Sequence, residues 1–536
     1  MRTLIAASSL GLLLVASGLQ AQEHMEPPAA RLLFRLEADG PAGWRTKFAP
    51  TNLGVMLASE EGARLWQPRL QPFDLALRRF LAGTTDGPGD GAARDRWVGY
   101  SGRMEFVLWS SEPKDPKERA VPYSALRFHG DGRTDLDALA KDLAGILARN
   151  GDAVGKLQAS QPTRDRDMVV VLLGDAATFA TSASLAKDLP PPDPIAAKGP
   201  ALRMVAHGQD VDRFLRGFDE EVAGVWKALG FGATQHAEFG IGTAGPFVQF
   251  EFAAQFHEGD RGMFGAFFPD AEAVPPLLQF VPDDGTPWKA GHFDLAALWR
   301  TGCAVADATS GEPAGSAAAA VAKAWGVDPL ADVFAHMHTD YLLLGMPGYS
   351  SEDGFVVDGL FVFRLRDAAK FAAGFERMRQ NWKPHVQKAK EEDHDGVTIT
   401  HFSTMFVPLQ FAVAHGNAFV AIGPGGADRI RAALDRSKLT ASAKPGEAWT
   451  PLLRHVPAGH NGVGEIDLHR VLTMHVSTAF ALLAFVPQDN LPEFLQHIDG
   501  DALVDELSPL LERHSLRTLR SATGFRAGRW HHRMFW

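Results

Sequence analysis

Residues 359–366 read GLFVFRLR, and Asp367 follows them directly. Aromatic and β-branched residues are frequent in this run, so it predicts a β-strand. Asp367 is a favourable helix N-cap and Pro384 a helix breaker, so a helix is predicted between them. Apolar residues recur there at helical spacing, at Phe371, Phe375, Met378 and Trp382. A strand that leads directly into a helix therefore organises this part of the chain.

The same unit recurs along the chain in a repeated order. Three earlier segments match three later ones in type and order, although not in residue identity: 104–109 with 359–366, 168–173 with 418–422, and 201–207 with 462–467. Further strand-to-helix passages are predicted at 53–57 and 291–294. An ordered correspondence of this kind indicates an internal repeat.

Each half of the repeat closes with a predicted β-hairpin. Residues 236–241 and 246–257 alternate around a glycine turn, and residues 516–521 and 525–536 alternate around Ala522-Thr523-Gly524. We therefore predict an α+β fold of two similar halves, each a largely antiparallel sheet with packed helices. The predicted boundaries are 22–285 and 286–536, related by a divergent duplication.

The order of elements and the segment 325–334 (WGVDPLADVF) resemble a group of exported bacterial proteins. These proteins carry a duplicated α+β domain of unknown function and are common in planctomycete-type genomes. The resemblance covers most of the chain after residue 21 and implies the same duplicated fold. Because that group has no established activity, the resemblance assigns no catalytic residue. It favours a non-enzymatic or uncharacterised role in the bacterial envelope.

The first 21 residues predict a secretory signal peptide. Arg2 precedes a small, apolar run from Leu4 to Leu19, and Ala21 is a small residue at the expected cleavage site. We expect cleavage between Ala21 and Gln22. The mature protein is then expected in the periplasm or outside the cell, without a transmembrane segment.

Charge and cysteine usage narrow the classes of partner and fold. The formal net charge of −11 argues against a nucleic-acid partner, which would require a basic surface. Cys303 is the only cysteine, so an internal disulfide is excluded and the fold must rest on its packed core. The small apolar neighbours of Cys303 predict a buried structural thiol.

One short pattern is typical of a metal site. The run His336-Met337-His338-Thr339-Asp340 resembles the start of the zinc-binding motif of metallo-β-lactamase-type hydrolases. That motif continues with a histidine, where this chain has Tyr341, and it follows a strand, whereas residues 330–335 are typical of a helix end. Two interpretations stay open. The run either holds zinc through His336, His338 and Asp340, or forms a polar turn before a strand that starts at Tyr341.

Two further charged segments each allow more than one interpretation. Residues 383–395 mix lysines and carboxylates around His394, which predicts a solvated helix end and turn or a site for a divalent cation. Residues 513–536 contain no acidic residue, and they include Arg526, Arg529 and Arg533. These arginines either contact anionic lipid, polysaccharide or an acidic surface of the same protein, or they face solvent.

The sequence carries none of several well-known catalytic patterns. It has no H-E-x-x-H, no G-x-S-x-G and no G-x-x-x-x-G-K-[ST]. We therefore expect a soluble, exported binding or structural protein without catalysis and without a cofactor, whose partner is an unknown ligand or envelope component. The alternative is a metal-dependent hydrolase that uses zinc at His336, His338 and Asp340.

Overall fold

The computed structural model describes most of the chain after residue 30. The described residues are 31–65, 91–110, 122–142, 158–159, 163–165, 168–174, 199–218, 226, 230–257, 261–271, 273–282, 286–345, 348–350, 354–356, 359–381, 387–403, 408–437, 460–468, 500–526 and 528–536. The predicted signal peptide and its cleavage site lie outside them. Within the described residues, no helix is both long and apolar enough to cross a membrane.

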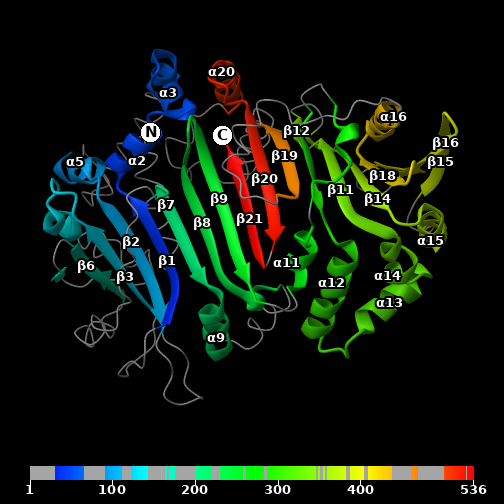
Figure 1. Ribbon diagram of the computed structural model, residues 1–536, viewed down its shortest axis with the longest axis horizontal. Coiled ribbons are helices and arrows are strands. Elements are labelled where there is room, and N and C mark those ends of the chain that lie inside the picture. The colour runs from blue at the N-terminus through cyan, green and yellow to red at the C-terminus, as the bar shows by residue number, and fades with distance from the viewer. Residues whose placement is uncertain are drawn as a thin grey trace, which may run out of the picture.

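In this part of the chain, 19 strands form a single antiparallel sheet (Figure 1). From one end to the other, they are β6 (Met168–Gly174), β3 (Pro122–His129), β2 (Arg103–Ser110), β1 (Arg31–Asp39), β7 (Leu202–His207), β8 (Thr234–Ala244), β9 (Phe247–Phe256), β21 (Arg529–Phe535), β20 (Thr518–Arg526), β19 (Gly462–Asp467), β10 (Trp288–His292), β11 (Met337–Gly345), β14 (Gly359–Leu365), β18 (Asn417–Ile422), β17 (Pro408–Ala414), β16 (Val397–Ser403) and β15 (Gln387–His394). The short β4 (Gln158–Ala159) and β5 (Thr163–Asp165) pair with β6. β12 (Gly348–Ser350) and β13 (Gly354–Val356) form a separate hairpin.

The pairing of β9 with β21 joins the two parts of the sheet. Gln249 lies opposite Phe535, and Gln255 lies opposite Arg529. Figure 1 shows the red C-terminal strands β20 and β21 between the green β9 and the orange β19. The C-terminal hairpin is therefore central in the sheet, not at its edge. The α+β class and the largely antiparallel sheet agree with the prediction.

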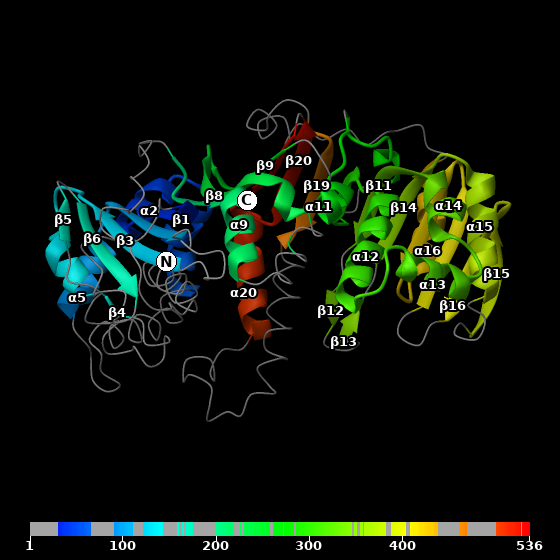
Figure 2. The same cartoon turned by 90° about the horizontal axis from the view of Figure 1, so that it is seen from below.

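Helices cover both faces of this sheet. They are α2 (Pro41–Phe48), α3 (Asn52–Ala58), α5 (Gly91–Gly99), α9 (Gly208–Phe218), α11 (Gly262–Phe267), α12 (Leu295–Ser310), α13 (Ser316–Trp325), α14 (Pro329–Asp332), α15 (Ala368–Asn381), α16 (Gly426–Ser437) and α20 (Gly500–Arg513). Figure 2 shows the strands along the length of the molecule, from β5 and β6 at one end to β15 and β16 at the other. The described residues also form three short 3-10 helices, η2 (Phe231–Ala233), η3 (Leu278–Phe280) and η4 (Phe334–His336).

Two large apolar clusters lie in the two parts of the sheet. In the first, Tyr100, Phe106 and Phe128 pack with Leu136 and residues of α5. In the second, side chains of β10, β11, β14 and β18 pack beneath α16. Burial of apolar surface is the main stabilising contribution in both clusters.

The unit at 359–381 forms as predicted. β14 covers Gly359–Leu365 and leads into α15, and Oδ1 of Asp367 accepts a hydrogen bond from the backbone amide of Lys370 at 3.0 Å. The predicted segment 53–57 is wrong, because these residues lie in α3 instead of a strand. The reason is an N-cap: Oγ1 of Thr51 accepts from the amide of Gly54 at 3.1 Å.

Two hairpin turns lie at other positions than the sequence predicted, and each contains a glycine with positive φ. Asp395 and Gly396 have φ of 54° and 81°, so they form the turn of a β15–β16 hairpin where a helix end was predicted. In the C-terminal hairpin the turn contains Gly528, whose φ is 72°. Ala522-Thr523-Gly524 instead lies within β20, so Phe525 faces Trp530 across the hairpin, on the same side of the sheet.

Candidate functional site

The H-x-H-x-D residues lie at the start of β11. His336 ends η4, whereas His338 and Asp340 belong to the strand. The register of β11 against β14 shifts between Met337 and Tyr341, so the strand is irregular where these polar residues occur. Irregularities of this kind change the direction of side chains. A strand, not the predicted polar turn, therefore holds His338 and Asp340.

Asp340 is buried, and its carboxylate contacts two side chains that the sequence did not suggest. Its Oδ1 lies 3.0 Å from Nδ1 of His292, and its Oδ2 accepts from Nη1 of Arg364 at 3.2 Å. His292 also donates from Nε2 to the carbonyl oxygen of Ala273 at 2.8 Å. Burial alone would raise the pKa of Asp340, but the hydrogen bonds and charges of His292 and Arg364 outweigh it and lower that pKa. This carboxylate is thus charged and paired within the protein.

The two histidines of the run belong to different elements, since His336 ends η4 and His338 lies on β11. Burial lowers the pKa of His338, and the charges of Arg364 and Arg366 lower it further against the opposing charge of Asp340. His338 is therefore a neutral imidazole near pH 7, the form that binds metals. However, the H-x-H-x-D side chains do not bring three ligand atoms within 4.8 Å of one another. Zinc at His336, His338 and Asp340 would require these side chains to reorient, so the zinc site stays a prediction.

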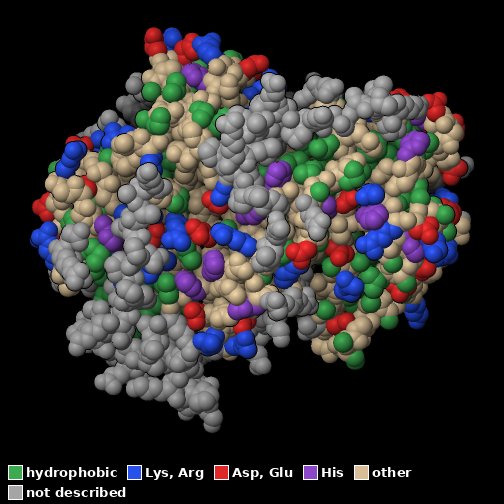
Figure 3. Space-filling view, in the orientation of Figure 1, with side chains coloured by type: hydrophobic (Ala, Val, Ile, Leu, Met, Phe, Trp, Pro, Cys, Tyr) green, Lys and Arg blue, Asp and Glu red, His purple; other side chains and the backbone are tan. Residues whose placement is uncertain are grey.

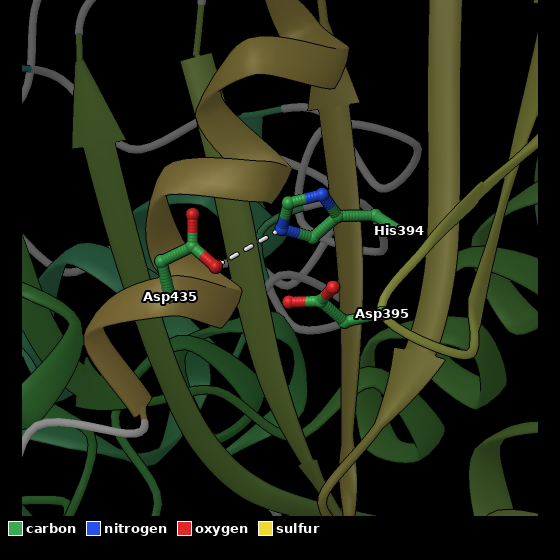
Figure 4. Close-up of side chains that lie close together, drawn as sticks. All are labelled: His394, Asp395 and Asp435. Carbon is green, nitrogen blue, oxygen red and sulfur yellow. Dashed lines mark hydrogen bonds and ion pairs between the residues drawn. The ribbon is translucent and has the colours of Figure 1, made fainter.

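A different group in the described residues does bring three such ligand atoms that close together. It consists of His394, Asp395 and Asp435 (Figure 4). His394 and Asp395 belong to the β15–β16 hairpin, and Asp435 lies on α16. Nε2 of His394 lies 3.0 Å from Oδ1 of Asp435. Both carboxylates are exposed, and exposed acidic groups are common without a bound ion.

A small cavity lies beneath α11, at the centre of the sheet. Its volume is about 20 Å³, which is room for one small polar group. Its wall includes Lys289 and Gly291 of β10, Tyr341 of β11, Gly462 of β19 and Thr523 of β20. Phenylalanine side chains close it on the side of α11, among them Phe267 and Phe268. The sequence pattern gave no indication of this cavity, because its residues come from five separate segments.

The C-terminal arginines have separate environments. Arg533 is half-buried and donates from Nε and Nη2 to Oε1 of Glu251 at 2.9 and 2.6 Å. Arg529 is exposed. The side chain of Arg526 lies outside the part of the chain that the structure describes. Figure 3 shows positive and negative side chains interspersed over the visible central strands. Arg533 therefore meets an acidic group of the same protein, and contact with an external anionic surface stays a prediction for Arg529.

Cys303 lies half-buried on α12, less buried than the sequence predicted. Burial raises the pKa of its thiol, and the nearby charge of Asp307 raises it further. A raised thiol pKa lowers the fraction of reactive thiolate, which fits a structural cysteine.

The comparisons with known protein families, curated proteins and solved structures find no match to this chain.

Proposed function

We propose that this chain is an exported protein of the bacterial envelope that binds a ligand or forms a structural part, without catalysis. The observation that carries the proposal is the state of Asp340, the carboxylate of the only catalytic-type motif. Its oxygens are engaged by His292 and Arg364 at 3.0 and 3.2 Å. Because His292 and Arg364 lower the pKa of this carboxylate, it is a weak general base, and the charge of Arg364 opposes a metal cation beside it.

The proposal includes a divergent duplication, which the strand order supports. Away from the β9–β21 pair, one series reads β9, β8, β7, β1, β2, β3, β6, and the other reads β21, β20, β19, β10, β11, β14, β18. Each series thus uses its strands in the same chain order, with the halves divided between β9 and β10. On this correspondence β14 matches β3, one strand beyond the match that the sequence suggested.

Export to the periplasm or beyond is part of the same proposal. It is supported by the apolar run that ends at Ala21 and by the resemblance to exported planctomycete-type proteins. N-terminal sequencing of protein recovered from the envelope should give Gln22 as the first residue. Recovery of the chain with Met1 in place would contradict this part of the proposal.

The binding role is tested on the full mature chain, purified without an affinity tag. Native mass spectrometry, compared with the denatured mass, should detect a retained small ligand, and metal analysis should find no stoichiometric zinc. The alternative function is a zinc-dependent hydrolase, favoured by the neutral imidazole of His338. Near-stoichiometric zinc that is lost on His338→Ala would establish that alternative and overturn the non-catalytic role.

A further inference from the structure

Two glycines, Gly291 and Gly462, line the floor of the cavity beneath α11, so no side chain covers the backbone at these two positions. Gly291 lies opposite Tyr341, and Gly462 lies opposite Thr523, on the adjacent strands β10 and β19. A Cβ atom at Gly462 would lie 3.3 Å from the carbonyl oxygen of Ala290, and one at Gly291 would lie 3.3 Å from Cε1 of Tyr341. Glycine inside a strand weakens it, and such glycines often mark a close approach by a ligand or another backbone.

The polar groups around these glycines include a cation, Lys289, that has no counterion among the described residues. Lys289 is half-buried, and burial alone lowers the pKa of its ammonium. No carboxylate of the described residues forms an ion pair with it, and Asp340 is held by His292 and Arg364. Removing a cation from water without a partner is unfavourable, so this position favours an anion beside it.

Neutral hydrogen-bonding groups flank Lys289. Burial raises the pKa of Tyr341 to about 12, so its hydroxyl stays protonated and can donate. Burial, with the charges of Lys289 and His531, lowers the pKa of His532 to about 3, so its ring is neutral at pH 7. Oγ1 of Thr523 lies 2.6 Å from Nδ1 of His532. With Nδ1 as its protonated nitrogen, the neutral ring of His532 donates to Oγ1 of Thr523, and the threonine keeps its own proton for a ligand at the cavity wall.

We propose that this cavity binds the carboxylate group of a small molecule, with Lys289 as its cationic partner and the hydroxyl groups of Tyr341 and Thr523 as its hydrogen-bond donors. The inference rests on the proposed binding role and assigns its ligand site. A carboxylate offers two acceptor oxygens, which suits one cation and two donors. A volume of about 20 Å³ holds one small polar group, so one carboxylate oxygen enters the cavity and the rest of the molecule lies outside it. A tetrahedral phosphate is larger and needs more donors.

Three probes test the chemistry on the full mature chain at constant ionic strength: acetate, its neutral analogue acetamide, and inorganic phosphate. Isothermal titration should show binding of acetate and none of acetamide. Lys289→Met should weaken acetate binding at least about tenfold, because it removes a charge-assisted contact. The matched control is Lys323→Met on the exposed surface of α13, which should bind acetate as the wild type does. Phosphate that binds more tightly than acetate would overturn the carboxylate assignment.

Gly291→Ala gives a second test that leaves every charge in place. Its methyl group would project from the floor toward the Tyr341 ring, so acetate binding should fall while the fold is retained. Equal acetate binding by wild type, Lys289→Met and Gly291→Ala would reject this site but leave the binding role intact. A wild type that binds none of the three probes rejects the site, and the absence of any retained ligand in native mass spectrometry would count separately against the binding role.

Discussion

The two parts of the sheet differ most in one row of side chains that crosses both of them. Successive members of the row lie directly opposite each other on neighbouring strands, so they share one face of the sheet. On the side of β9 the row is Arg127, Glu105, Glu37, Arg203, Gly240 and Glu251. On the side of β21 it is Arg533, Ala522, Val463, Ala290, Leu342, Val362 and Phe419. The first part is ionic and the second is apolar beyond Arg533.

The ionic part is deeply buried at β1, β2 and β3. Glu105, 2% exposed, lies 3.0 Å from Nε of Arg35 and 2.9 Å from Nη1 of Arg127. Nη2 of Arg103 lies 2.8 Å from Oε2 of Glu37. Glu37 and Glu105 lie directly opposite each other, which repels unless cations separate them. The arginines therefore make this strand pairing possible.

In the apolar part, the same face of the sheet packs against a helix. Ala290, Leu342 and Val362 are each 0% exposed and belong to the cluster that packs against Ile430 and Leu434 of α16. The two parts of the sheet thus have two kinds of interior. Buried ion pairs stabilise little more than a well-packed apolar core would, but removal of one partner is strongly unfavourable. The first part should therefore be the more sensitive to loss of a charge and to acid.

The largest effect is expected from deletion of residues 525–536, which removes the strand that joins the two parts. Phe525 and Phe535 are 3% and 2% exposed, and loss of such aromatic side chains costs about 3–5 kcal/mol each. The edges of β9 and β20 would also lose their partner strand. We expect aggregation or degradation, measured as soluble yield and resistance to protease. A soluble truncated chain with an unchanged melting temperature would show that β21 is dispensable.

The next largest effect is expected from Glu105→Leu. It leaves Arg35 and Arg127 buried without their shared carboxylate, so the free energy of unfolding should fall by about 3–5 kcal/mol in a urea titration. The matched control is Glu251→Leu in the half-buried pair with Arg533, which should cost no more than about 1 kcal/mol.

A triple variant shows whether charge or volume is responsible. Arg35→Met, Glu105→Leu and Arg127→Met together replace the buried ion pairs of Glu105 with apolar side chains, while Glu37 keeps its pairs with Arg103 and Arg203. Replacement of a whole buried ionic group is often neutral or stabilising, so we expect most of the lost stability to return. If the triple variant is less stable than Glu105→Leu alone, the ionic interior is specifically required and the comparison with the apolar part fails.

Asp340→Asn should have an intermediate effect. It removes the charge that His292 and Arg364 bind, and a hydrogen bond to a charged group contributes roughly 1.5–3 kcal/mol. The pKa of Asp340 is lowered by folding, so its stabilising contribution is present above the unfolded pKa of about 3.9 and is lost as pH falls through the folded pKa. Urea titrations between pH 6 and pH 3 should show this acid loss in the wild type and less of it in the variant. If the free energy of unfolding falls equally with pH in the wild type and the variant, the loss does not come from Asp340.

Local patterns in the sequence predict the strand-to-helix units well. The strand within 359–366 and the helix that Asp367 caps can be predicted from the sequence, because strand propensity and capping act over a few residues. The strand predicted at 53–57 is wrong because a short apolar run fits either a strand or a buried helix. The N-cap hydrogen bond of Thr51 favours the helix. The two glycines Gly524 and Gly528 could each make a turn, and only the conformation of the second shows which does.

Long-range pairing was beyond such patterns. The contact of β9 with β21 joins Glu251 to Arg533, which lie 282 residues apart, and no local signal specifies it. The same holds for the sites. Asp340 was a sequence candidate, but its partner His292 comes from another strand, and Asp435 reaches His394 from a helix. Lys289 had no motif at all. Its environment appears only when β10, β11, β19 and β20 are assembled.

The smallest effect is expected from His338→Ala. His338 is half-buried on β11 beside Arg364 and Arg366, whose charges oppose an ion at this place. A substitution without a buried partner to lose should change the free energy of unfolding by no more than about 0.5 kcal/mol. The matched control is His394→Ala, which removes the histidine of the one described group whose three ligand atoms lie within 4.8 Å. Zinc titration of both variants and the wild type separates the two places. We expect His338→Ala to bind zinc as the wild type does. A loss of zinc confined to His338→Ala would place the ion at β11 and support the zinc-dependent alternative.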